Sequence, residues 1–198
     1  MTQLGHFARH NGGQFRRLGG AISPGFLSSD IDRTHRKTPE SLDAYDLYLR
    51  GYAHYLHFNR EGFAEAGRFF AKAIQLDNRY SNAYALLALC HCYELFLSLS
   101  EDLGKTIAEV KQNARRAVEL DRNNSLAYVV LAWHSIYTKQ HDQALVNSNL
   151  AVELNPSSTL AYNARAFACA FGGRHPEAIA DAERSIRYSL RDPFLIMS

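Results

Sequence analysis

A pattern of apolar and small residues recurs in the second half of the chain at a fixed spacing of about 34 residues. Leu126-Ala127-Tyr128 returns as Leu160-Ala161-Tyr162, and Ala144-Leu145 returns as Ala178-Ile179. Each period contains two segments whose apolar positions follow the periodicity of an α-helix. A period of this length with two helices predicts a stack of helical hairpins, because one hairpin cannot bury its apolar face alone.

The same pattern extends toward the N-terminus with a longer spacing. Asn82-Ala83-Tyr84 repeats the helix opening ahead of Leu126, and this unit carries about ten extra residues. They fall between Phe96 and Ile107, where Ser98, Ser100 and Gly104 predict a lengthened turn. Ser100-Glu101-Asp102 predicts the start of the next helix, since acidic residues suit a helix N-terminus.

The periodicity therefore predicts an all-α fold, an αα-hairpin superhelix of about four repeats that follows a flexible N-terminal leader. Structure is expected to begin near Thr38-Pro39, a suitable N-cap and first helical residue. The predicted segments are a basic leader over 1–37, an array over 38–198 with units at about 43–79, 80–122, 123–156 and 157–192, and the start of a further helix at 193–198.

Net charge and cysteine content bear on two questions, whether the chain binds nucleic acid and in which compartment it works. The net charge is only +2, and the basic excess lies in residues 1–40, which hold six Lys or Arg against three Asp or Glu. These basic residues are dispersed and few aromatics accompany them, so nucleic acid is not an expected partner. Residues 1–29 lack the apolar stretch of a secretory signal, and the three cysteines form no disulfide spacing. We therefore expect a cytoplasmic protein.

Neither a metal site nor a membrane span is expected. Cys90 and Cys92 are two positions apart on a predicted helix, so their thiols point about 200° apart and cannot share a metal. The most apolar run, residues 83–100, is interrupted by His91 and Glu94, which favours a buried helix over a membrane span. No motif for a cofactor is present, so none is expected.

The last residues, Phe194-Leu195-Ile196-Met197, are apolar. They either fold back over the fourth unit or begin a fifth repeat, and we favour the second interpretation because solenoids usually end on a helix with a polar outer face. An exposed apolar end also predicts self-association, in which one array stacks on another.

Small residues at fixed positions of the pattern resemble those of tetratricopeptide repeats. The resemblance covers residues 38–198 and implies paired helices that approach closely, so a bulky side chain at Ala132 is expected to destabilise the fold by about 1–3 kcal/mol. The matching residues are Gly51, Ala88, Ala132 and Ala166 in the first helices, and Ala66, Ala73, Ala117, Ala144, Ala151 and Ala178 in the second helices.

A narrower resemblance concerns the entry into the array. The stretch 36–51 is similar to the start of the C-terminal repeats of bacterial class III adenylate/guanylate cyclase-like proteins, and 190–194 resembles a later junction in the same regions. In that family the repeats follow a catalytic or DNA-binding part, and residues 1–37 resemble neither. The resemblance implies a regulatory, protein-binding segment without cyclase activity. It leaves open a truncated C-terminal segment of a cyclase-like or winged-helix signalling protein that acts in cis.

In tetratricopeptide proteins the first helices line a concave groove. Transferring the groove positions of the family to this sequence predicts a partner-binding surface that is apolar and aromatic, formed by Tyr48, Tyr52, Tyr55, Leu89, Tyr93, Val129, Trp133, Tyr137, Asn163, Phe167 and Phe171. Such aromatic residues suit the anchoring of a partner helix or an extended peptide. The alternative is that they pack against one another or against further repeats.

The leading hypothesis is a non-catalytic module that binds a peptide or a partner domain through this groove. The Lys and Asn clamp of repeats that hold a chaperone's terminal carboxylate is absent, so a chaperone tail is not the expected partner. An enzyme is not expected, because His54, His57 and His134 occur without a glycine-rich loop, a nucleophile elbow or a metal-ligand spacing.

Overall fold

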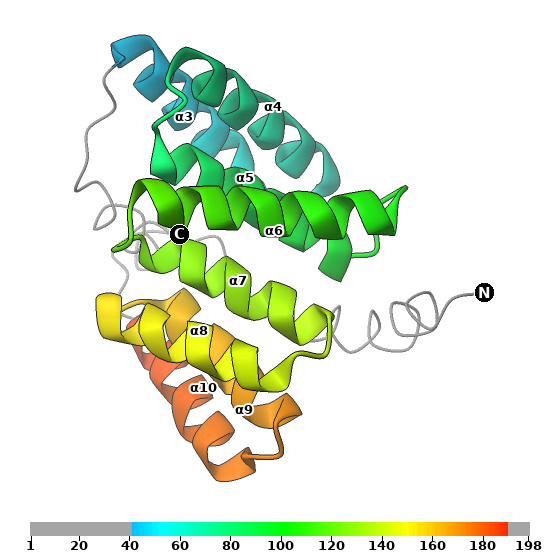
Figure 1. Ribbon diagram of the computed structural model, residues 1–198, viewed down its shortest axis with the longest axis vertical. Helices are drawn as coiled ribbons and strands as arrows, with labels where there is room; N and C mark the ends of the chain where they lie inside the picture. The colour runs from blue at the N-terminus through cyan, green and yellow to red at the C-terminus, as the bar shows by residue number, and fades with distance from the viewer. Residues whose placement is uncertain (1–40, 190–198) are drawn as a thin grey trace.

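The computed structural model describes residues 41–189, which form eight α-helices and contain no strand (Figure 1). The helices pair into four hairpin units, which confirms the predicted all-α solenoid. The predicted leader at 1–37, the helix start at Thr38 and the apolar segment 194–197 lie outside the described residues. In chain order the helices are α3 (Leu42–Tyr55), α4 (Arg60–Leu76), α5 (Ser81–Phe96), α6 (Leu103–Leu120), α7 (Ser125–Tyr137), α8 (His141–Leu154), α9 (Thr159–Phe171) and α10 (His175–Ser189).

Side-chain caps fix where several helices begin. Ser41 caps α3 by accepting from the Ala44 N–H at 3.2 Å, and Asn59 caps α4 by accepting from the Gly62 N–H at 2.7 Å. The N-cap of α6 is Asp102, whose carboxylate accepts from the Lys105 N–H at 3.0 Å. The helix start predicted at Ser100 is therefore two residues early. Each such cap stabilises its helix by about 1 kcal/mol.

The extra residues of the second unit are mostly helical, which corrects the prediction of a lengthened turn. Helices α5 and α6 have 16 and 18 residues, against 13 and 14 in α7 and α8. Most of the insertion therefore lengthens the two helices, and only a small part lengthens the turn between them. Gly104, which suggested a turn, lies inside α6.

The turn inside each unit uses one residue with a left-handed backbone. These residues are Phe58, Ser98, Lys139 and Gly173, with φ of 47°, 57°, 61° and 77°. In the last three turns the backbone N–H of the following residue reaches back into the first helix, as in Gln140 N–H to Ser135 O at 2.8 Å. Only Gly173 adopts this conformation without a steric cost from a Cβ atom.

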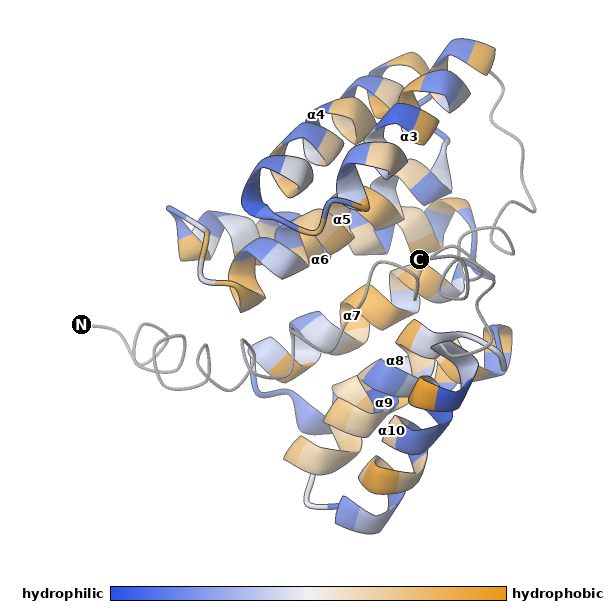
Figure 2. Cartoon of the chain, turned by 180° about the vertical axis from the view of Figure 1, so that it is seen from behind, coloured by the Kyte–Doolittle hydropathy of each residue, from blue (hydrophilic) through white to orange (hydrophobic). Residues whose placement is uncertain are grey.

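The eight helices form two layers. Within the described residues, α7 contacts both α5 and α9, whereas successive second helices make no comparable contact with one another. The first helices therefore lie on the inside of the superhelix and the second helices on the outside. Figure 2 shows that α5 and α7 are hydrophobic along most of their length, while α10 alternates between hydrophobic and hydrophilic residues. This difference follows from α5 and α7 having neighbours on both sides.

Small residues allow the helices of a unit to approach closely. A Cβ atom at Gly51 would lie 2.8 Å from Cε1 of Phe70 in α4, so no side chain fits there. Ala88, Ala132 and Ala144 are fully buried. These contacts explain why the small positions of the repeat occur where they do.

A buried polar network joins the second and third units. The Asn124 side chain caps α7 by accepting from the Ala127 N–H at 3.1 Å. Its amide nitrogen donates to Ser81 Oγ at 2.8 Å and to Asn82 Oδ1 at 2.9 Å. Ser81 Oγ in turn donates to the Ala117 carbonyl at 2.9 Å. One asparagine side chain thus provides hydrogen bonds to buried polar groups of both units. Buried polar groups need such partners because they are shielded from water.

Candidate partner-binding surface on the first helices

The predicted groove residues lie on the first helices, but their exposure differs from unit to unit. We call this surface the inner face. Tyr48, Tyr55, Leu89, Tyr93, Val129, Trp133 and Tyr137 are buried. The partly exposed members are Tyr52, Asn163, Phe167 and Phe171, and all of these except Tyr52 belong to the fourth unit.

In the first three units the inner-face aromatics form a continuous chain of ring contacts. Tyr93 of α5 lies at its centre, with ring centroids 6.0 Å from Tyr55 of α3 and 5.8 Å from Trp133 of α7. Phe63 of α4 stacks on Tyr93 at 5.1 Å with nearly parallel rings. Phe96 contacts Trp133 at 5.5 Å. Packing of these aromatics against one another, the alternative interpretation of the sequence, therefore accounts for part of the pattern.

The stripe of tyrosines on α3 divides into two stacked pairs. Tyr45 stacks on Tyr48 at 6.3 Å, and Tyr52 stacks on Tyr55 at 6.4 Å. Tyr48 also contacts Tyr80 at 5.0 Å, at the start of the second unit. The stripe thus has one buried and one partly exposed ring in each pair.

Sequence patterns did not identify Phe58, Phe63 and Phe96 as members of this surface. Phe58 lies 5.0 Å from Tyr93 because the left-handed turn after α3 directs it toward α5. Periodicity within a helix carries no information on a turn residue. Phe63 belongs to a second helix, and its contact with Tyr93 depends on how two units stack.

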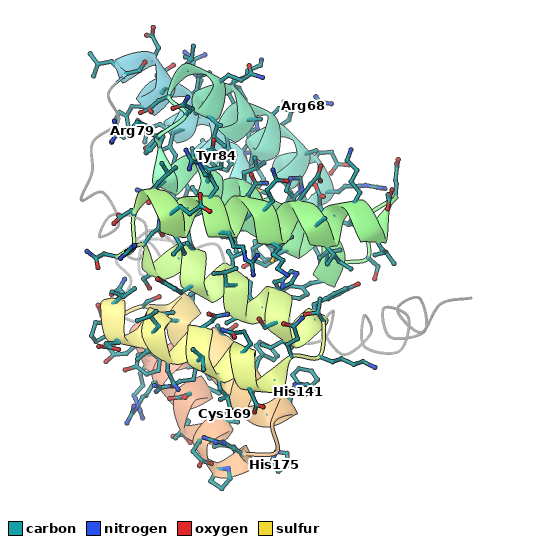
Figure 3. All side chains as sticks on the ribbon, viewed as in Figure 1. Arg68, Arg79, Tyr84, His141, Cys169 and His175 are labelled. Atoms are coloured by element: carbon teal, nitrogen blue, oxygen red, sulfur yellow. The ribbon has the colours of Figure 1, made fainter. Side chains whose placement is uncertain are left out.

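The fourth unit has a more open inner face. The His141 ring at the start of α8 stacks on Phe171 at 6.4 Å, and Figure 3 shows it at the end of its helix. Arg165 forms two hydrogen bonds of 2.7 Å to Asp181 of α10, an intramolecular ion pair with only 7% of the acidic side chain exposed. This pair fixes α9 against α10, and Asn163, Phe167 and Phe171 are partly exposed.

Several buried polar atoms of the first helices have no hydrogen-bond partner in the part of the chain that the structure describes. They include the indole Nε1 of Trp133 and the side-chain oxygen Oδ1 of Asn163, which lie on neighbouring first helices. One is a donor and the other an acceptor. Burial raises the pKa of the Tyr55 and Tyr93 hydroxyls, so both remain protonated at neutral pH.

The histidines that the sequence offered as candidates, His54, His57 and His134, do not assemble into one site within residues 41–189. His54 and His57 stack on each other at 6.0 Å, and His54 also stacks on Phe69. His134 is 6% exposed, and burial together with the nearby Lys111 and Arg115 lowers its pKa to about 4. It is therefore neutral at pH 7 and buried in the core between first helices.

The cysteines belong to the core. Cys90, Cys92 and Cys169 are all buried and unpaired in a disulfide. Burial raises the pKa of Cys90 and Cys92, so their thiols stay protonated. Among the described residues no three His, Cys, Asp or Glu side chains lie close enough to hold a metal ion.

A second depression lies on the outer layer, beside α6. This open cleft of about 660 Å³ is lined by Tyr84 of α5 and by the α6 residues Lys111, Arg115, Arg116 and Glu119. Figure 3 shows Tyr84 beside the outer helices. Arg116 pairs with Glu119 at 3.1 Å, and both side chains are substantially exposed. Exposed pairs of this kind contribute little, and the cleft contains no buried polar group that would orient a ligand.

The hydrophobic helices α5 and α7 do not qualify as membrane spans. Between residues 41 and 189 no helix combines the length and the hydrophobicity that a bilayer crossing requires.

Comparison with known proteins gives a likeness in fold. No family model matches the chain, and no curated protein matches it. A crystal structure of MamA superposes with a TM-score of 0.51 at 17% identity, covering 75% of this chain and 80% of MamA. A second MamA structure gives a TM-score of 0.51 at 16% identity and covers 96% of this chain and 94% of its own. YrrB, described as a TPR protein with an unusual peptide-binding site, reaches a TM-score of only 0.38 at 18% identity over 75% of this chain and 88% of YrrB, too low to carry an argument.

These findings do not test the resemblance to cyclase-like C-terminal regions, which stays a prediction. At 17% and 16% identity the likeness to MamA concerns the fold and not the function. The helix pairing, the buried small residues and this likeness together define the architecture. The described part of the chain is an all-α solenoid of four helical hairpins of the tetratricopeptide type.

Proposed function

We propose that this solenoid is a non-catalytic protein-interaction module that binds an extended peptide, or an extended segment of a partner domain, through its inner face. The observation that carries the proposal is the combination of partly exposed rings with orphan polar atoms on adjacent first helices. Phe167 and Phe171 offer apolar contact area, and Trp133 Nε1 and Asn163 Oδ1 have no partner within residues 41–189. The other residues of the predicted groove lie on α3, α5 and α7.

An extended main chain matches this chemistry better than an amphipathic helix does. A helix satisfies its own N–H and C=O groups, whereas an extended peptide presents both kinds of group along its length. Both atoms are buried in the free chain, so a peptide reaches them only when neighbouring side chains of the inner face move aside. One of its carbonyls would then accept from the Trp133 indole, and one of its N–H groups would donate to Asn163. Leaving either of these atoms unpaired costs about 1–3 kcal/mol, which the peptide would recover on binding.

A non-catalytic role agrees with the groups present on the surface. The inner face offers rings, an amide and tyrosine hydroxyls, and its charged pair Arg165–Asp181 is already closed at 2.7 Å. His134, the buried histidine of α7, is neutral at pH 7. None of these groups is poised for proton transfer or nucleophilic attack.

The chain contains a built-in reporter for the test, because Trp133 is its single tryptophan. Peptides selected from a random library on the full-length protein would be titrated while Trp133 emission is recorded. We expect a saturable change in emission with the wild type. Asn163→Ala and Phe167→Ala should each weaken binding about tenfold, by loss of one hydrogen bond or one apolar anchor.

Tyr84→Ala is the matched control, since it removes an aromatic ring from the outer cleft and leaves the inner face unchanged. All variants must retain the helical circular dichroism of the wild type. Equal peptide affinity in the wild type, Asn163→Ala and Phe167→Ala would overturn the inner face as the binding surface. Loss of binding in Tyr84→Ala alone would transfer the site to the outer layer.

A further inference from the structure

The two ends of the described solenoid expose residues whose counterparts at the junctions between units are buried or partly buried. At each junction the second helix of one unit packs on the first helix of the next, as α8 packs on α9. Figure 1 shows α3 at one end of the stack and α10 at the other. We call the outward side of α3 (Asp46, Leu49 and Ala53) the entry face, and the outward side of α10 (Ile179, Ala182 and Ile186) the exit face.

The exit face repeats the pattern by which α8 binds α9. Ile179, Ala182 and Ile186 lie one full repeat after Leu145, Ser148 and Val152. Ser148 is 0% exposed, Val152 is 9% exposed and Leu145 is partly buried, in a helix that packs on α9. Ile179 and Ile186 are 62% and 56% exposed, although they carry the same kind of side chain. The exit face thus has the composition of a junction without its partner helix.

The entry face repeats the complementary pattern. Its residues correspond to Ala127, Val130 and His134 in α7 and to Ala161, Ala164 and Ala168 in α9, all of them buried. Leu49 is 43% exposed, and Ala53 and Asp46 are exposed as well. Asp46 is the one departure from the pattern, because the other first helices have alanine at this position.

The exit face also departs from the pattern, but here the unusual residue is basic. Arg187 in the last turn of α10 occupies the position held by Gln75, Glu119 and Glu153 in the other second helices. In sequence this position and that of Asp46 flank the short turn between two units, as the exposed Glu153 and the buried Ala161 do after α8. An acid that appears at the entry face is therefore matched by a base at the exit face.

We propose that a second copy of this chain is the partner of both faces, so that the exit face of one molecule packs on the entry face of the next. The contact is heterologous and has the register of the internal junctions, with Arg187 of one copy beside Asp46 of the other. In the monomer Asp46 pairs with Arg50 at 2.9 Å, and both side chains are more than half exposed. Because such a pair contributes little, exchanging it for an intermolecular one costs little. This association is independent of peptide binding to the inner face, and it uses α10 itself and not the segment 194–197.

The test uses two single variants of the full-length chain, each of which blocks one face. Leu49→Asp places a charge on the entry face, and Ile186→Asp places one on the exit face. Sedimentation velocity over a range of concentrations should show the wild type forming assemblies larger than a dimer. Each variant alone should remain a monomer, with its association weakened at least about tenfold. An equimolar mixture of the two should form a heterodimer and stop there, because one intact face of each kind remains.

A second experiment exchanges the charges at the proposed Asp46–Arg187 contact. Asp46→Arg should weaken association, and addition of Arg187→Asp in the same chain should restore it, whereas a purely structural effect would not be reversed. Unchanged thermal unfolding of dilute protein controls for folding in every variant. The proposal is overturned if the wild type is monomeric at all concentrations, or if Leu49→Asp still dimerises, which would indicate a symmetric contact between two exit faces.

Discussion

Helices α8 and α10 carry the same apolar pattern at a shift of one repeat, yet their surroundings differ. Helix α8 packs on α9, and Val152 is only 9% exposed there. In α10 the corresponding Ile186 is 56% exposed. The difference shows that a repeat encodes its contact with a neighbour whether or not the described residues include that neighbour. A residue's contribution to stability must therefore be judged from the junction and not from the repeat alone.

Breaking the covered junction should have the largest effect. Val152→Asp places an unpaired carboxylate between α8 and α9 and should lower the free energy of unfolding by about 3 kcal/mol or more. Ile186→Asp, the same change at the equivalent open position, should alter it by less than about 0.5 kcal/mol. Urea unfolding followed by circular dichroism in dilute protein measures both. Similar losses in the two variants would mean that the exit face is covered within the monomer.

The second-largest loss in the free energy of unfolding is expected at the polar junction between the second and third units. Asn124→Ala removes the cap of α7 and leaves Ser81 and Asn82 without their shared donor, so we expect a loss of about 2–3 kcal/mol. Asn59→Ala is the control, because Asn59 caps α4 in an exposed position, and it should cost only about 1 kcal/mol. Equal losses on urea unfolding would show that the network across the junction adds nothing beyond the cap.

A covered junction that contains a titratable residue should respond to pH. His134 is buried at the position that α9 fills with Ala168, and its pKa in the folded state is about 4, below its ordinary value of 6.5. Its contribution is therefore fully present above pH 6.5 and is lost as the pH falls toward 4. Allowing for solvent screening of Lys111 and Arg115, the loss should be about 1–2 kcal/mol.

His134→Gln provides the comparison for this pH dependence. The variant should show a shallower decrease in thermal stability between pH 7 and pH 4 than the wild type. Parallel decreases in the two proteins would contradict a neutral, buried histidine at this junction.

The smallest effects should come from the turns inside the third and fourth units, which share one backbone conformation. Gly173→Ala meets no atom within 4 Å of the new Cβ, so its cost of about 1 kcal/mol should be purely conformational. Lys139→Gly should stabilise the protein by up to about 1 kcal/mol, since φ at Lys139 is already 61°. The midpoint of thermal unfolding should fall in Gly173→Ala and rise in Lys139→Gly. Shifts of the same sign in the two variants would contradict the shared turn geometry.

The sequence predicted the features of the fold that depend on repetition. The repeat period located the units, and small residues such as Gly51 and Ala132 marked the close approaches of their helices. Features that depend on context were missed. Most of the additional residues of the second unit extend α5 and α6, which pack against each other, and the rest lengthen the turn between them. The left-handed conformation of Phe58 has no signal in its residue type.

The sequence predicted on which helices the inner-face residues lie, but not which of their side chains are exposed. Register alone placed the predicted residues on the first helices. Whether a ring is covered depends on contacts between units, such as Phe63 on Tyr93, which no single helix reveals. The orphan atoms of Trp133 and Asn163 likewise become apparent only once the neighbouring helices are in place. Their role in binding a peptide remains a prediction.

Hydrogen exchange measured by mass spectrometry at low and high protein concentration tests the difference between covered and open helices most directly. Peptides from α7 and α8 should exchange slowly at both concentrations, because their faces are covered within one molecule. Peptides from α3 and α10 should exchange quickly in dilute protein and slow down as the concentration rises and molecules stack. Exchange in α10 as slow as in α8 in dilute protein would contradict the account.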